Sequence, residues 1–118
     1  MMSASFGRRA RLTHKADYQH VFAQSNRSGD RYFTVLARRN ELGYPRLGLA
    51  VSRKVAKSAV IRNRVKRIVR ESFRHAQEQL NSFDVVVIGR PQTGTCSNEA
   101  LFASLRQHWA RLATWAKS

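Results

Sequence analysis

Between Ala59 and Glu71 the sequence reads AVIRNRVKRIVRE, in which closely spaced cations are interspersed with apolar residues. At about 100° per residue around a helix, the apolar and cationic side chains separate onto opposite sides. The apolar side, followed to residue 76, consists of Ile61, Val65, Ile68, Val69, Phe73 and Ala76. The opposite side consists of Asn63, Lys66, Arg67, Arg70 and Arg74, with Arg64 at its border. Arg62 falls in the first turn, where it could reach forward past the helix start. The segment therefore predicts a helix that docks on a sheet and presents a cationic face.

The cationic side lacks the mixed charges that usually stabilise a solvated helix face. Like charges sit at Lys66/Arg70 and Arg70/Arg74, and each such pair costs roughly a few tenths of a kcal/mol without a partner. A solvated charged face is the alternative, but the pattern favours a phosphate-binding face. Arg far outnumbers Lys in the chain, and its planar group binds phosphate bidentately and stacks on bases. This composition favours structured RNA as the partner.

The whole chain has the size of one domain and an unusual charge. It has 118 residues, of which 42% are hydrophobic and 25% charged, and a formal net charge of +15 at pH 7. Such a charge is relieved by a polyanion, first of all nucleic acid. An anionic membrane surface is the second candidate, but no apolar run approaches the length of a membrane span. Cys96 is the sole cysteine, which excludes an intrachain disulfide and fits a reducing, cytoplasmic setting.

The N-terminal region predicts a basic arm followed by a short helix. Residues 1–12 carry Arg8, Arg9 and Arg11 with little apolar content, so we expect a partly mobile arm. Thr13 is a plausible N-cap for a helix over about residues 14–24. Within it Tyr18, Val21 and Phe22 form one stripe.

The rest of the chain alternates strands and helices. We predict a turn at 26–30, a strand at 32–38, a turn at 40–45 and a strand at 46–52. A helix at about 59–80, capped by Ser58, follows, and then a strand at 83–89 and a loop at 90–97. The last predicted element is a helix to about residue 116, with Asn98 as its cap. In the strand 46–52 the larger residues face one way, and the small face could accept a helix or leave a groove. The last helix carries a stripe typical of a core: Leu101, Phe102, Leu105, Trp109, Leu112 and Ala116. This order predicts a single α+β sandwich of helices on one small sheet.

Residues 59–71 closely resemble the signature of the bacterial ribonuclease P protein family, an Arg-Asn-Arg core followed by Lys-Arg and then Arg-Glu. The resemblance covers about residues 6 to 115 in the same order. It includes Arg11-Leu12, Asp17-Tyr18, Val21-Phe22, Leu47-Gly48-Leu49, Val51-Ser52-Arg53-Lys54 and Asp84-Val85-Val86-Val87. Two positions depart from the family pattern: Ala56 stands where Gly is common, so the loop there could turn differently, and Tyr18 stands where Phe is frequent.

The resemblance implies a two-layer sandwich of order α-β-β-β-α-β-α with a left-handed βαβ crossover. General rules would predict a right-handed crossover. The resemblance also implies that the catalytic centre lies in a separate RNA subunit, which uses Mg²⁺ to free the mature 5′ end of tRNA. The protein would bind that RNA and the 5′ leader of precursor tRNA, in the cytoplasm, with no cofactor of its own and no obligate protein partner.

The same resemblance assigns roles to residues. Contacts to the RNA subunit or proximity to the substrate are implied for Arg62, Asn63, Arg64, Lys66, Arg67 and Arg70. Neighbouring cations extend this expected RNA-binding set: Arg53, Lys54, Lys57 and Arg74. Tyr18, Phe22 and Lys54 would line a cleft for the single-stranded leader, where aromatic faces stack on bases. Burial of Tyr18 and Phe22 in the core is an equal alternative. The arm residues Arg8, Arg9 and Arg11 would add accessory contacts.

Nothing in the sequence predicts catalytic or metal-binding residues in the chain itself. Its seven acids are scattered, at Asp17, Asp30, Glu41, Glu71, Glu78, Asp84 and Glu99. His14 and His20 point to different sides of the first helix, while His75 and His108 look isolated. The alternatives are a ribosomal or assembly protein that binds structured RNA, then a stand-alone nuclease. A duplex-DNA binder fits least, because no helix-turn-helix spacing flanks the basic helix.

Overall fold

The computed structural model describes residues 26–81 and 83–116. Its elements are β1 (Asn26–Gly29), β2 (Phe33–Arg39), β3 (Arg46–Ala50), α2 (Ala59–His75), β4 (Phe83–Gly89), the short 3₁₀ helix η2 (Pro91–Thr95) and α3 (Asn98–Ala116). The predicted arm at 1–12 and the predicted helix at 14–24 lie outside the described residues. The order confirms the α+β class, with three strands before the basic helix, as the family resemblance implies.

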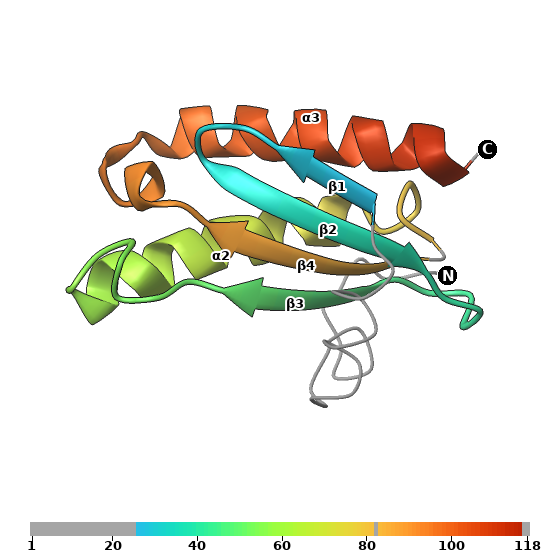
Figure 1. The fold of residues 1–118 in the computed structure, drawn as a ribbon, viewed down its shortest axis with the longest axis horizontal. Coiled ribbons are helices and arrows are strands. Elements are labelled where there is room, and N and C mark those ends of the chain that lie inside the picture. The colour runs from blue at the N-terminus through green and yellow to red at the C-terminus, as the bar shows by residue number, and fades with distance from the viewer. Residues whose placement is uncertain (1–25, 82, 117–118) are drawn as a thin grey trace.

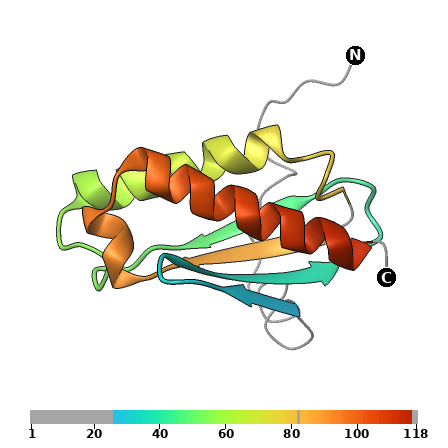
Figure 2. The ribbon, with the colours of Figure 1, turned by 90° about the horizontal axis from the view of Figure 1, so that it is seen from above.

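The four strands form one mixed sheet in the order β1-β2-β4-β3. β1 pairs antiparallel with β2, and β2 pairs antiparallel with β4, whereas β3 pairs parallel with β4. Helices α2 and α3 lie side by side on the same face of the sheet (Figures 1 and 2). In Figure 1, β3 and β4 both point left, β4 lies above β3, and α2 returns behind the sheet. The β3–α2–β4 crossover is therefore left-handed, against the general rule.

The core lies between this sheet and the two helices. α2 contributes Val65, Ile68, Val69 and Phe73, and α3 contributes Leu101, Leu105, Trp109 and Leu112. Phe73 meets Trp109 edge to face, with ring centroids 6.0 Å apart, and the Trp109 Nε1 donates to Ser72 Oγ at 2.8 Å. Each ring therefore packs in a favourable geometry, and the buried indole N–H is satisfied. Most of the two predicted apolar stripes is confirmed as core, with Phe102 partly buried against it; Ile61, at the start of α2, is only half-buried and lies outside the core cluster. Nothing tests the prediction for the side chain of Ala116, which lies outside the described residues.

The central strand β4 explains the continuous apolar run in the sequence. Val85 and Val87 pack toward the helices, while Val86 packs with Leu36 on the other face of the sheet. A strand buried on both faces needs no alternation of polar residues. At the edge of the sheet, Leu47 of β3 is buried under the helices, so the larger face of this strand is the one that receives them.

Three local predictions are wrong. Residues 26–29, predicted as a turn, form strand β1, because their backbone pairs with β2 from Asn26↔Ala37 to Gly29↔Thr34. Helix α2 ends at His75 instead of residue 80, and turns follow that bury Leu80 completely. The cap of α3 is Ser97, whose Oγ accepts from the amide of Ala100, and not Asn98. Ser58 caps α2 as predicted, by accepting from Ile61 N.

Candidate nucleic-acid interface

The exposed side of α2 carries the predicted cations. Asn63, Arg67 and Arg70 are exposed and Lys66 is half-buried; these four residues are called the cationic face below. Among the described residues, no acid forms an ion pair with Lys66, Arg67 or Arg70. Their like charges are therefore uncompensated within this part of the chain. The sequence-based separation of the helix into an apolar and a cationic side is confirmed.

Arg74 differs from the rest of the predicted set because its charge is compensated. Its guanidinium donates to both carboxylate oxygens of Glu71, one turn earlier. His75 Nε2 lies 2.9 Å from the same carboxylate. The hydrogen bond from Arg74, and after it that from His75, lowers the pKa of Glu71. The C-terminal end of α2 thus offers less free positive charge than its middle.

The loop before α2 adds further exposed cations. Arg53, Lys54 and Lys57 are all exposed, whereas Val55 between them is buried. The amide of Val55 donates to Ser52 O at 3.0 Å, and that of Lys54 donates to Ser52 Oγ at 3.2 Å. No described non-glycine residue, Ala56 included, has a positive φ, so alanine is unstrained at this departure from the family pattern.

Arg62 and Arg64 lie in the same region but bind backbone carbonyls. Arg62 reaches past the start of α2, as predicted, and donates to Ala56 O at 2.8 Å and to Lys57 O at 2.7 Å. Arg64 turns toward the loop around η2, where its acceptors include Asn98 Oδ1 at 3.0 Å. Sequence reasoning found the reach of Arg62, which is local, but not the partners of Arg64, which lie far along the chain.

Five predicted site residues lie outside the described residues: Arg8, Arg9, Arg11, Tyr18 and Phe22. The choice between cleft and core for Tyr18 and Phe22 therefore stays a prediction. Lys54, the remaining residue of the expected leader cleft, is exposed in the loop before α2.

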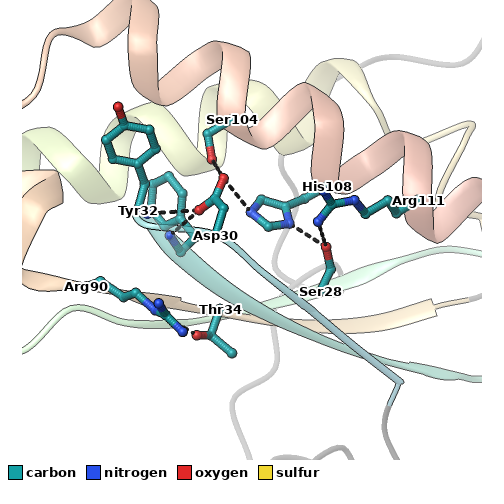
Figure 3. Close-up of polar contacts among 9 residues, drawn as sticks. Ser28, Asp30, Tyr32, Thr34, Arg90, Ser104, His108 and Arg111 are labelled. Carbon is teal, nitrogen blue, oxygen red and sulfur yellow. Dashed lines mark hydrogen bonds and ion pairs between the residues drawn. The ribbon is translucent and has the colours of Figure 1, made fainter.

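A Ser–His–Asp cluster joins β1 to α3, which the sequence did not predict (Figure 3). Ser28 Oγ lies 2.7 Å from His108 Nδ1, and His108 Nε2 lies 3.2 Å from Asp30 Oδ2. The last distance would allow an ion pair only with a protonated His108, and Nε2 makes no well-formed hydrogen bond. Ser28 and His108 are only 3% and 1% exposed, and Arg111 already donates to Ser28 Oγ. A substrate cannot reach this hydroxyl, so the cluster is a structural tie rather than a nucleophilic site.

The hydrogen bonds around His108 favour its neutral form. Ser28 Oγ accepts from Arg111 and so can donate to Nδ1, which leaves the ring proton on Nε2 beside Asp30. Burial lowers the pKa of His108, and the Asp30 carboxylate counteracts this only in part. For Asp30, burial alone would raise the pKa, but hydrogen bonds from Ser104 and from the amides of Phe33 and Tyr32 lower it overall.

These shifts predict a loss of stability in acid. In the unfolded chain, His108 is protonated below its ordinary pKa of 6.5. In the folded protein its pKa is lower, so the unfolded state binds more protons, and the free energy of unfolding falls as the pH drops. A second decrease follows below pH 3.8, where Asp30 is protonated in the unfolded chain first. Urea unfolding from pH 7 to pH 5 measures the first effect. His108→Gln should flatten this part of the curve; an equal slope in both proteins would contradict the assignment.

The described residues contain no group of three or more His, Cys, Asp or Glu placed to hold a metal ion. None of their helices is both long and apolar enough to cross a bilayer. Cys96 is half-buried beside η2, and its carbonyl accepts from Arg64. An α+β sandwich whose exposed cations, on one helix and its preceding loop, have no acidic partner in the described part of the chain defines a protein of the nucleic-acid-binding class.

Comparisons with known proteins identify the family. A family model described as Ribonuclease P matches residues 6–113. The chain is 47% identical over 113 residues to the ribonuclease P protein component of Vibrio parahaemolyticus, and 48% identical over 112 residues to that of Aliivibrio fischeri. The first alignment covers 96% of each chain; the second covers 95% of this chain and 96% of its relative.

Solved structures agree. The RNase P protein of Staphylococcus aureus aligns with a TM-score of 0.79 and 30% identity, over 88% of this chain and 94% of that one. The RNase P protein of Thermotoga maritima, in complex with 1-(4-fluorophenyl)-2-thiourea, aligns with a TM-score of 0.78 and 34% identity, over 86% and 98% of the two chains. The chain belongs to the ribonuclease P protein family, and is thus the protein subunit of a ribonuclease holoenzyme.

Proposed function

We propose that this subunit binds the catalytic RNA of ribonuclease P through the cationic face and the loop before α2. The supporting observation is that exposed cations gather there without acidic partners among the described residues. Counterion release from RNA phosphates would supply the binding free energy. Within the predicted set we assign direct contacts to the most exposed members: Arg53, Lys54, Lys57, Asn63, Arg67 and Arg70, with Lys66 beside them. Arg74 contributes less, because Glu71 offsets its charge.

The proposed substrate is precursor tRNA, whose single-stranded 5′ leader is held by Tyr18, Phe22 and Lys54. A cation beside aromatic rings suits an unpaired strand, since the ring faces stack on bases of any sequence and the cation contacts the backbone. The basic arm at 1–12, with Arg8, Arg9 and Arg11, would add contacts to phosphates. The whole chain would act as one RNA-binding domain in the cytoplasm, without an obligate protein partner.

Hydrolysis of the precursor is assigned to the RNA subunit and its Mg²⁺ ions. The chain's own contribution is to bring two polyanions together: its positive charge lowers the repulsion between catalytic RNA and substrate. Weaker repulsion also favours Mg²⁺ uptake by the RNA. The scattered acids and the inaccessible Ser–His–Asp cluster are the observations that favour this division of labour.

A cleavage assay with long and short leaders tests the leader assignment. The protein is combined with an in vitro transcript of a bacterial ribonuclease P RNA and Mg²⁺ at low salt, and the release of mature 5′ ends is followed. Tyr18→Ala and Phe22→Ala should each raise the apparent KM for a precursor with a long leader by about tenfold, the effect of one lost stacking contact. A precursor with a one-nucleotide leader serves as the control. An equal rise for both precursors would assign the two rings to the core instead.

A further inference from the structure

We infer that Arg62 and Arg64 are positioning residues for the RNA-binding surface, and that Arg64, both of whose terminal nitrogens are engaged within the protein, is not a phosphate ligand. The inference rests on the proposed function, because the surface that they position is the one proposed to bind the RNA subunit. Both residues belong to the Arg-Asn-Arg core of the signature, so sequence alone gives them the same role as Arg67 and Arg70. Their hydrogen bonds separate them from those two residues.

Arg62 holds the loop that carries Arg53, Lys54 and Lys57. Its Nη1 donates to two consecutive carbonyls, Ala56 O at 2.8 Å and Lys57 O at 2.7 Å, just before the N-cap of α2. A planar guanidinium can bind two neighbouring oxygens at once, which fixes the backbone of both residues. Together with the bonds from Val55 and Lys54 to Ser52, this contact defines the shape of the loop.

Arg64 holds the second loop, between β4 and α3. Its two terminal nitrogens have four acceptors there: Thr93 O at 3.4 Å, Gly94 O at 3.3 Å, Cys96 O at 3.3 Å and Asn98 Oδ1 at 3.0 Å. The individual bonds are long, but they converge from one side chain onto one short segment. Both terminal nitrogens of Arg64 donate to acceptors within the protein. The guanidinium therefore lacks the pair of free N–H groups that bidentate binding of a phosphate requires.

The two loops also touch directly. A Cβ added to Gly94 would lie 2.6 Å from the carbonyl oxygen of Val55, closer than real Cβ contacts allow. Glycine at 94 thus permits the backbones of the two loops to meet. Arg62, Arg64 and Gly94 join the loops into one rigid unit at the N-terminal end of α2. Preorganisation of this unit keeps Arg53, Lys54 and Lys57 in place before the RNA arrives, which saves ordering entropy on binding.

The test compares Arg64 with Arg67 by paired substitutions to Ala and Lys, using binding to the ribonuclease P RNA transcript over a range of salt concentrations. Arg64→Ala should weaken binding about tenfold at every salt concentration. The slope of log K against log salt should change by less than about half a unit. Arg64→Lys should not restore the affinity, since Lys lacks the planar fork. Arg67→Ala should lower the slope by about 0.7–0.9, and Arg67→Lys should restore most of it.

Amide hydrogen exchange of the RNA-free protein is the second readout. Arg64→Ala should speed exchange in residues 52–57 and 93–96 while the core strands stay protected. Gly94→Ala provides an independent variant that keeps every cation and separates the loops: it should reproduce the loss of affinity with an unchanged slope. This variant also decides the question if Arg64→Ala does not fold.

Three outcomes would overturn the inference. If the slope of log K against log salt fell by about a full unit in Arg64→Ala and returned in Arg64→Lys, Arg64 would be a phosphate ligand. Unchanged affinity of folded Arg64→Ala would make its contacts merely structural, and unchanged affinity of Gly94→Ala would exclude the loop contact as a determinant of binding. Failure of the proposed function is distinct from these, because then Arg67→Ala would also leave affinity and slope unaltered.

Discussion

Replacing Arg67 and Arg70 together by Ala should weaken binding of the ribonuclease P RNA about 30-fold at low salt. Both side chains are exposed on the cationic face of α2 and form no ion pair with a described acid. Two exposed phosphate contacts at about 1 kcal/mol each account for this loss. The slope of log K against log salt should fall by about 1.5, since each lost phosphate contact removes roughly 0.7–0.9. Filter binding or fluorescence titration at several salt concentrations measures both quantities.

A matched control separates this contact from a change in net charge. Arg31, in the turn after β1, and Arg106, on α3, are also exposed, and their double substitution by Ala removes the same two charges. It should reduce affinity only slightly and leave most of the slope intact. Alanine favours helix at positions 67 and 70, so the fold should persist in the test protein. Equal effects of the two double variants would refute a localised binding face on α2.

Phe73→Ala should lower the free energy of unfolding by about 3–5 kcal/mol, the usual range for removal of a buried aromatic ring. Phe73 is fully buried and contacts Trp109 edge to face, at the junction of α2, α3 and the sheet. Because a domain of this size is stable by only about 5–15 kcal/mol, much of the total would be lost. Urea unfolding, followed by tryptophan fluorescence, measures the change.

Phe73→Leu is the control for this second prediction. It keeps an apolar side chain in the site and should lose clearly less stability than the alanine variant, since the cavity left is smaller. A loss below about 1 kcal/mol in Phe73→Ala would mean that the α2–α3 contact is not part of the cooperative core. RNA binding by both folded variants should stay close to that of the unaltered protein, because residue 73 lies on the opposite side of α2 from the cationic face.

Features that depend on local spacing were predictable from the sequence. The burial of Val65, Val69 and Phe73 follows from helical periodicity, and the Ser58 cap and the reach of Arg62 need only the first turn of α2. The exposure of Arg67 and Arg70 follows from the same geometry.

Features that depend on distant partners were not predictable from local patterns. Residues 26–29 have the composition of a turn, and they form a strand because β2 pairs with them and His108 contacts Ser28 from α3. The carbonyl partners of Arg64 belong to a segment that no pattern in α2 points to. The left-handed crossover opposes the general rule, and only the family resemblance implied it.

The order of strands in the sheet has a consequence for how the chain folds during synthesis. Among the strands of residues 26–81 and 83–116, β3 pairs only with β4, and β4 follows it in the chain only after the whole of α2. While residues 83–89 of a nascent chain are still inside the ribosome, the backbone of β3 therefore lacks its β4 partner. Helix α2 then has no completed sheet to pack against. Such long-range pairing slows folding, so most of the protein's stability should arise in a single late step, when β4 inserts between β2 and β3.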